Sequence, residues 1–99
     1  MESRKIVRAD KAGVFFGNIE GVEGVEGDTV VMTNARRIWY WEGAASLSEL
    51  AMYGTSNPRS CKFPCAVDKV KIFGVIEIID VTEKAAASID GVPEWKKRS

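Results

Sequence analysis

The sequence predicts a mainly β protein of the α+β class, an antiparallel β-meander or small barrel with two short helices. Segments rich in β-branched and aromatic residues follow one another through short, turn-like connections, which favours antiparallel pairing of neighbouring strands. Two other short stretches carry the signature of a helix start. The chain has 99 residues, which is the size of one domain. We therefore expect a single domain over residues 1–99, with flexible ends at 1–3 and 96–99.

The first half of the chain carries four segments of strand-forming composition. In chain order, the expected strands are residues 4–9, 14–19, 28–33 and 37–42. Residues 34–36 are expected to form a tight turn, and the Gly-Val-Glu repeat of residues 21–27 an acidic, flexible loop. Gly17, inside the second strand, indicates a bulge or a close approach of another backbone.

Two short helices are expected in the second half. Ser46 is a typical N-cap, Glu49 completes a capping box with it, and Gly54 is the expected stop. A second helix is expected over residues 83–89, starting after Thr82.

The longest β signal covers residues 66–80, and Gly74 is expected to bend it. Residues 75–79 contain so little polarity that they are expected to be buried on both faces, or to have one face in the core and one against a partner chain. Glu77 is then either a buried acid, or a residue that faces water on an edge or pairs with a lysine across the sheet. We expect a homo-oligomer, because so short a chain buries only a modest core.

The chain contains no histidine. This excludes histidine acid–base chemistry, Ser-His and Cys-His nucleophiles, and the commonest transition-metal ligand. Cys61 and Cys65, without a further cysteine, cannot complete a zinc site within one chain, although a symmetric oligomer could pool them. We therefore expect a protein that is not an enzyme, has no cofactor and no metal site, and keeps both thiols reduced and partly buried.

The charge balance and the hydropathy of the chain argue against two classes of partner, nucleic acids and membranes. Lys and Arg number 14 and so do Asp and Glu, and this balance argues against a nucleic-acid partner. No signal-peptide pattern follows the first residues, and the apolar runs are too short to cross a bilayer. We expect a cytoplasmic protein without a membrane partner.

The most unusual local feature is Arg-Arg-Ile-Trp-Tyr-Trp over residues 36–41, followed by small residues and the capped helix. In a strand, alternation places Arg37, Trp39 and Trp41 on one face. A guanidinium beside aromatic rings is suited to pair a phosphate and stack a base, and amides at a helix start attract anions. The predicted ligand-binding residues are Arg36, Arg37, Trp39, Trp41, Ala45, Ser46 and Leu47.

The alternative is structural. Two tryptophans in one strand of a small domain commonly anchor its core or a subunit interface. Gly43, Ala44 and Ala45 can be small simply to let the helix pack closely. Arg59 and Lys62, beside the cysteines, could complete an anion site, but a solvated loop is the simpler interpretation.

Residues 33–47, Thr-Asn-Ala-Arg-Arg-Ile-Trp-Tyr-Trp-Glu-Gly-Ala-Ala-Ser-Leu, resemble a family of small uncharacterised proteins of tailed bacteriophages and prophages. Later segments that resemble this family are residues 61–63, 76–79, 82–85 and 92–95. The resemblance implies a context rather than an activity, namely a phage-encoded accessory protein in the cytoplasm of an infected host bacterium.

We therefore expect a phage-encoded, non-enzymatic binding protein that counters host defence. In this interpretation it sequesters a phosphate-bearing, nucleotide-type signalling ligand in a site at an oligomer interface. The alternative is a virion or protein–protein interaction component, either a minor structural protein or an inhibitor of a host protein.

Overall fold

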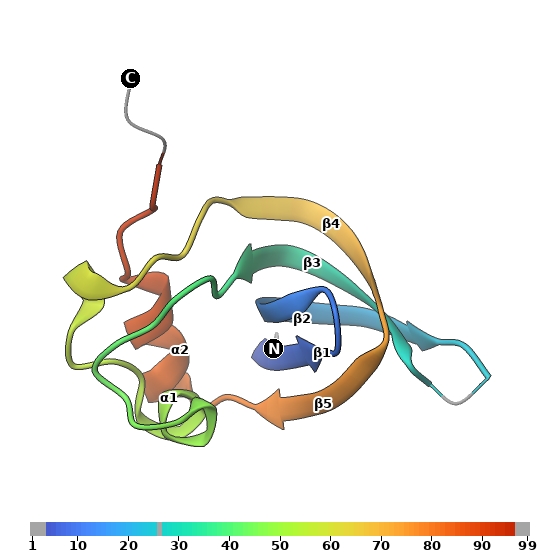
Figure 1. Ribbon diagram of the computed structural model, residues 1–99, viewed down its shortest axis with the longest axis horizontal. Coiled ribbons are helices and arrows are strands. Elements are labelled where there is room, and N and C mark those ends of the chain that lie inside the picture. The colour runs from blue at the N-terminus through green and yellow to red at the C-terminus, as the bar shows by residue number, and fades with distance from the viewer. Residues whose placement is uncertain (1–3, 26, 97–99) are drawn as a thin grey trace.

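The computed structural model of the protein describes residues 4–25 and 27–96. A five-stranded antiparallel sheet with the order β4-β3-β2-β1-β5 forms its centre (Figure 1). The strands are β1 (Arg4–Ala9), β2 (Gly13–Glu23), β3 (Thr29–Arg37), β4 (Ala66–Phe73) and β5 (Val75–Asp80). The helices are α1 (Leu47–Tyr53) and α2 (Glu83–Asp90), with a turn of 3-10 helix at Pro58–Ser60. The predicted mainly β fold with two short helices is confirmed.

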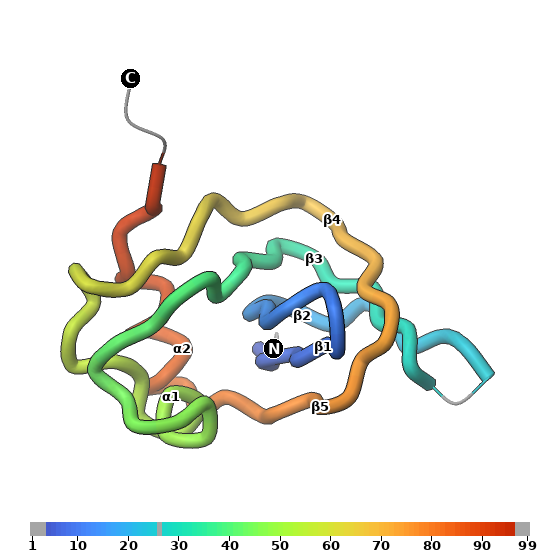
Figure 2. Tube along the Cα trace, viewed as in Figure 1, coloured from blue at the N-terminus to red at the C-terminus, as the bar shows by residue number. Residues whose placement is uncertain are grey.

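The sheet curls because its two edge strands are consecutive in the chain. β1, β2 and β3 form an antiparallel meander, whereas β4 pairs with β3 and β5 pairs with β1. Only Gly74 separates β4 from β5, and its φ of 73° is a conformation that favours glycine. Figure 2 shows this stretch as one continuous curve around the meander. The bend predicted at Gly74 is confirmed, and it carries the chain from one edge of the sheet to the other.

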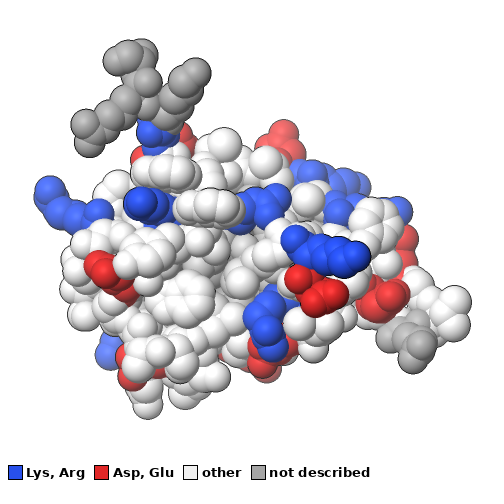
Figure 3. Space-filling view, viewed as in Figure 1, with Lys and Arg blue, Asp and Glu red and all other residues white. Residues whose placement is uncertain are grey.

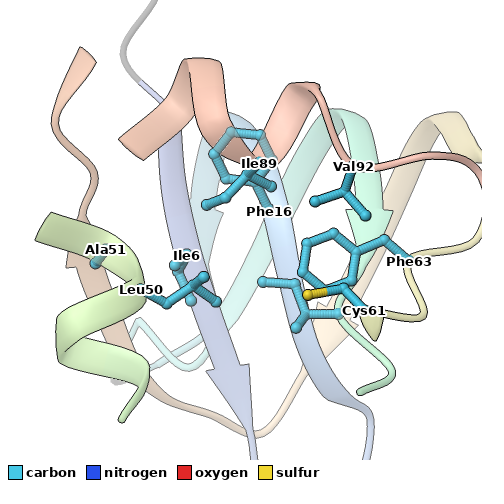
Figure 4. Close-up of a cluster of buried hydrophobic side chains, with 9 residues drawn as sticks. Ile6, Phe16, Leu50, Ala51, Cys61, Phe63, Ile89 and Val92 are labelled. Atoms are coloured by element: carbon cyan, nitrogen blue, oxygen red, sulfur yellow. The ribbon is translucent and has the colours of Figure 1, made fainter. Parts of the chain in front are cut away.

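Both faces of the sheet bury apolar side chains, because successive residues of a strand point to opposite faces. One group, here called the helix-side cluster, lies between the sheet and the helices (Figure 4). It consists of Ile6, Phe16, Ile38, Leu50, Ala51, Cys61, Phe63, Ile89 and Val92. The other group, the interior cluster, lies inside the curl of the sheet and consists of Val7, Ala9, Phe15, Val30, Met32, Ala35 and Ile72.

The helix boundaries follow the predicted caps. Ser46 Oγ accepts a 3.1 Å hydrogen bond from the Glu49 amide, and α1 ends at Gly54, whose φ is 79°. Thr82 Oγ1 accepts a 3.0 Å bond from the Ala85 amide at the start of α2. These side chains satisfy amides that a helix start leaves without partners. The predicted N-caps at Ser46 and Thr82 and the predicted end of α1 at Gly54 are confirmed.

The turn predicted at residues 34–36 is wrong, because β3 continues through them to Arg37. The irregularity is instead a bulge: Asn34 has a φ of 48°, and the pairing of β2 with β3 shifts register opposite it. A Cβ on Gly17 would lie 2.8 Å from the carbonyl oxygen of Asn34. The close backbone approach predicted at Gly17 is therefore confirmed.

The strand predicted at residues 37–42 is also wrong. After Arg37 the chain leaves the sheet, and Ile38 enters the helix-side cluster. Only an isolated bridge between Tyr40 and Lys62 remains. β2 also runs on to Glu23, so the predicted loop at 21–27 begins later than expected.

β5 alternates half-buried and exposed residues, with Ile76 and Ile78 exposed. Burial of this strand on both faces within one chain is therefore wrong. Glu77 accepts a 2.8 Å hydrogen bond across the sheet, as the pairing interpretation expected, but from Arg8 rather than from a lysine. In the part of the chain that is described, no helix is long and apolar enough to span a membrane.

Of the ends that were predicted to be flexible, residues 1–3 and 97–99 lie outside the described residues. Lys96 is described; it is exposed, and its Nζ lies 3.7 Å from a carboxylate oxygen of Glu94.

Candidate ligand-binding surface

Arg36, at the end of β3, is tied into the fold. Its guanidinium lies 5.4 Å from the centroid of the Phe63 ring, and burial lowers its pKa against the opposing effects of Asp90 and Glu94. It donates five hydrogen bonds of 2.8–3.4 Å to backbone carbonyl oxygens, those of Phe63, Pro64, Ile89, Val92 and Pro93. A guanidinium has five N–H donors, so these bonds occupy it within its own chain. These bonds leave no N–H group of Arg36 for the predicted phosphate contact, and the residue holds the segment after α2 against β3.

At the start of α1, one of the three amides predicted to bind an anion, that of Ala45, is bonded within the chain. The Ala45 amide donates a 2.7 Å hydrogen bond to Glu49 Oε1, while Ser46 Oγ accepts from the Glu49 amide. This reciprocal pair resembles a capping box in which the returning carboxylate reaches the residue before the cap. Leu47 packs against the helix-side cluster. The prediction that these amides are open to an anion is wrong for Ala45, because Glu49 already supplies a negative charge there.

The two tryptophans of residues 36–41 separate. Trp41 is half-buried against the helix-side cluster, as the structural alternative predicted. Trp39 is 64% exposed, and its backbone amide donates a 3.2 Å hydrogen bond to the carbonyl oxygen of Lys62. Of the two indoles, Trp39 is the one that offers area to a ligand.

Lys62 lies between two further exposed aromatic residues. Its Nζ is 5.7 Å from the ring centroid of Tyr40 and 5.7 Å from that of Trp95. Tyr40 and Trp95 are 43% and 48% exposed, respectively. Among residues 4–25 and 27–96, Lys62 forms no ion pair. Trp39, Tyr40, Lys62 and Trp95 are here called the aromatic–lysine surface.

Backbone pairing brings these residues together from distant parts of the chain. The Lys62 amide donates a 2.7 Å hydrogen bond to the Tyr40 carbonyl oxygen, and the Trp95 amide donates a 3.0 Å bond to that of Phe63. Glu94 and Phe63 form a parallel bridge beside the latter bond. Lys62 was considered as an anion ligand from the sequence, but Tyr40 and Trp95 were missed. No local pattern places Trp95 next to Lys62, because only tertiary pairing does so.

The hydroxyl group of Tyr40 also has a partner within the chain. Its hydroxyl donates a 2.7 Å hydrogen bond to Glu42 Oε1. This bond, together with the negative charge of Glu42, raises the pKa of the Tyr40 phenol. The ring is thus positioned between an ammonium group and a carboxylate.

Arg37 points to a different place. Its guanidinium lies 4.4 Å from the centroid of the Phe15 ring and donates a hydrogen bond to the Ala12 carbonyl oxygen. It borders a pocket of about 240 Å³, here called the Arg37 pocket. The residues that line it are Phe15, Ala35, Arg37, Pro64, Cys65, Val67 and Val70. A second pocket, of about 440 Å³, is lined by Asp10, Lys11, Ala12, Lys71, Phe73 and Gly74.

The thiols and acids present no metal centre in the described ranges, where no group of three potential ligands gathers. Cys61 is buried and Cys65 is exposed, so the prediction of two partly buried thiols is wrong for Cys65. Figure 3 shows the basic side chains of one face as separate positions with uncharged surface between them. No continuous basic patch of the kind that follows a nucleic-acid backbone is visible on that face.

Comparison with known proteins assigns the chain to a protein family. Neither the curated proteins nor the solved structures contain a match to the chain. Residues 2–89 match the model of a family that is described as a domain of unknown function, DUF6948. Because this match covers nearly the whole chain, the protein belongs to the DUF6948 family.

Proposed function

We propose that the protein is a non-enzymatic binding protein that recognises a nucleotide-type ligand at the aromatic–lysine surface. One observation supports this most strongly: the Lys62 ammonium lies 5.7 Å from the centroids of two exposed rings, Tyr40 and Trp95. In this proposal an aromatic face stacks the base and Lys62 pairs a phosphate oxygen.

The energetics support such a ligand. Stacking of a base on an aromatic side chain contributes roughly 1–3 kcal/mol per base. A charge-assisted hydrogen bond to phosphate is about twice as strong as a neutral one. Several other basic side chains already have acidic partners, such as Arg4 with Asp90 and Lys5 with Asp80. The described contacts of the Lys62 ammonium are with the rings of Tyr40 and Trp95, so its N–H donors are available to an anion.

The wider proposal concerns context. The resemblance of residues 33–47 to phage proteins supports a role inside an infected bacterium. Binding of a nucleotide-type signal there would withdraw it from the host's defence. We also propose that the site adjoins a second copy of the chain, because Trp39 leaves most of its indole uncovered within one chain.

Calorimetric titration with nucleotides tests the proposal. The wild-type protein is expected to bind a mono-, di- or cyclic nucleotide with an affinity that falls as salt rises. Lys62→Met is expected to weaken binding about tenfold, which corresponds to about 1.4 kcal/mol. Arg59→Met is the matched control, because Arg59 is an exposed basic residue nearby with no described ring contact. No heat with any nucleotide, or equal affinities of the two variants, would contradict the proposal.

A second candidate is an interaction protein, either a virion component or an inhibitor of a host protein. It is favoured by β5, an edge strand on which Ile76 is 56% exposed and Ile78 is also exposed. An exposed apolar edge strand is a typical place for another chain to pair. Light scattering after size exclusion would detect self-association, and Ile78→Lys is expected to abolish it. Mass spectrometry of purified virions would detect a structural role.

A further inference from the structure

Given the proposed function, on which this inference rests, we propose that the ligand of the aromatic–lysine surface is a free dinucleotide, with two bases joined through one phosphodiester. The observation behind it is the placement of Lys62, whose Nζ is 5.7 Å from the ring centroids of both Tyr40 and Trp95. A mononucleotide has a single base and would leave one of these exposed rings uncovered. A dinucleotide places one base on each ring and its phosphate at the lysine.

The two rings flank Lys62 because its segment is the middle one of three. Tyr40 pairs with Lys62 in an antiparallel bridge, and the next residue, Phe63, pairs with Glu94 in a parallel bridge. Backbone groups of consecutive residues in an extended chain point to opposite sides, so Tyr40 and Trp95 lie on opposite sides of the middle segment. Their ring centroids are at most twice 5.7 Å apart, because both distances end on one nitrogen atom. Two bases joined through one sugar–phosphate linkage span such a separation when they are not stacked on each other.

Both rings are positioned before a ligand arrives. The Tyr40 hydroxyl donates a 2.7 Å hydrogen bond to Glu42, and the Trp95 amide donates a 3.0 Å bond to the Phe63 carbonyl oxygen. Tyr40 is 43% exposed and Trp95 is 48% exposed, so each offers aromatic area to a base. Preorganised rings lower the entropy that binding must overcome, and successive aromatic side chains stack successive bases.

The charge of the site matches one phosphodiester. Lys62 is exposed and, within residues 4–25 and 27–96, has no acidic partner. The acids next to the two rings have partners of their own: Glu42 accepts from Tyr40, and Glu94 lies 3.7 Å from Lys96. A phosphodiester carries a single negative charge, whereas a terminal phosphate carries about 1.5 to 2 at pH 7. One lysine therefore neutralises the linkage of a dinucleotide but not a terminal phosphate.

The chain contains a matched pair with only one ring. Lys84 Nζ lies 5.9 Å from the ring centroid of Tyr53, which is 61% exposed. In the described part of the chain, no second ring lies at Lys84. This pair offers a comparable ring and cation without the arrangement that a second base requires, so it serves as the internal control.

Calorimetric titration with two ligands of equal charge tests the inference. The first is adenylyl-(3′→5′)-adenosine, which has two bases and one phosphodiester. The second is the methyl ester of adenosine 3′-monophosphate, which keeps the phosphodiester but lacks the second base. Because stacking of one base changes affinity by roughly five- to 150-fold, the dinucleotide is expected to bind about tenfold or more tightly than the ester. Amide chemical-shift changes at both Tyr40 and Trp95 are expected in the wild-type protein with the dinucleotide.

Variants test the need for both rings. Tyr40→Leu and Trp95→Leu are each expected to abolish the preference for the dinucleotide over the ester, because each removes one of the two stacking surfaces. Tyr53→Leu is expected to retain the full preference. Thermal unfolding curves establish that the variants are folded, and the wild-type chemical shifts supply a result that needs no variant.

The outcomes separate this inference from the proposed function. Equal affinities of the wild-type protein for the two ligands, or amide shifts at only one of the two rings, would overturn the dinucleotide while the nucleotide site stands. Absence of binding by both ligands would overturn the proposed function itself. A ten-residue adenylate strand provides the last comparison. An affinity above that expected from its number of overlapping two-base units would assign the surface to single-stranded nucleic acid and overturn a free dinucleotide.

Discussion

The guanidinium of Arg36 lies 5.4 Å from the centroid of the Phe63 ring and donates a 2.8 Å hydrogen bond to the carbonyl oxygen of the same residue. Through its remaining bonds it reaches the end of α2 and the segment that follows. One side chain of β3 therefore fastens the chain before β4 and the chain after α2. This contact separates the roles of two adjacent arginines, because the Arg37 guanidinium lies over the Phe15 ring instead.

Replacement of Arg36 by lysine is expected to lower the free energy of unfolding by roughly 2–3 kcal/mol, because a lysine ammonium cannot bond this spread of carbonyl oxygens. Urea unfolding followed by tryptophan fluorescence measures the change. Arg37→Lys is the control, with an expected change within about 0.5 kcal/mol. Equal destabilisation by the two variants would contradict the fastening role of Arg36.

Truncation of the two neighbouring tryptophans is expected to have unequal effects. Trp39→Ala should change the free energy of unfolding by less than about 0.5 kcal/mol, because the indole is largely exposed. Trp41→Ala should cost about 2 kcal/mol, since it removes a ring packed on the helix-side cluster. Loss of Trp39 should also shift the remaining fluorescence to shorter wavelength. A severe loss of stability in Trp39→Ala would show that its indole is covered in solution.

The phenol of Tyr40 is expected to titrate at higher pH than that of an ordinary tyrosine. The hydrogen bond to Glu42 raises its pKa above the usual 10.0, so folding favours the protonated phenol. The associated stability is fully present below the unfolded-state pKa, near pH 10, and is lost as pH rises through the folded-state pKa. The chain has two tyrosines, so Tyr53→Phe isolates the signal of Tyr40 in an ultraviolet titration.

Glu42→Ala in that background is expected to move the pKa of Tyr40 back toward the ordinary value. The substitution removes both the hydrogen-bond acceptor and the negative charge that oppose ionisation of the Tyr40 phenol. An unchanged titration curve would mean that Tyr40 and Glu42 do not interact in solution.

Substitution of Gly54 by alanine is expected to destabilise the protein by at least about 2 kcal/mol. Its φ of 79° is unfavourable for alanine, and an added Cβ would collide with the side chain of Ser88 on α2. Gly21→Ala is the matched control, because no heavy atom outside Gly21 and its two chain neighbours lies within 4 Å of its Cβ position. Thermal unfolding compares the two. Similar melting temperatures would exclude a close packing of α1 on α2 at Gly54.

Part of the candidate site was predictable from the sequence. The rest depends on contacts between residues that are distant in the chain. Trp39 is identifiable from the sequence as an aromatic residue next to two arginines, and Lys62 as a cation beside the cysteines. Their arrangement with Trp95 requires pairing between residues 40, 62 and 63 and the segment at 94–95, which no short-range pattern specifies. The Arg37 pocket is even less visible, because its lining comes from β2, β3, β4 and the chain before β4.

The sequence by itself determined the features whose causes are local. These include the strand content, the caps at Ser46 and Thr82, and the backbone conformations at Gly54 and Gly74, because a few neighbouring residues set each of them. Only the tertiary structure decided the fate of residues 36–41. The carbonyl oxygens that bind Arg36 lie 27 to 57 residues away in the chain, and those long-range bonds help to fix which side chains are buried and which remain exposed.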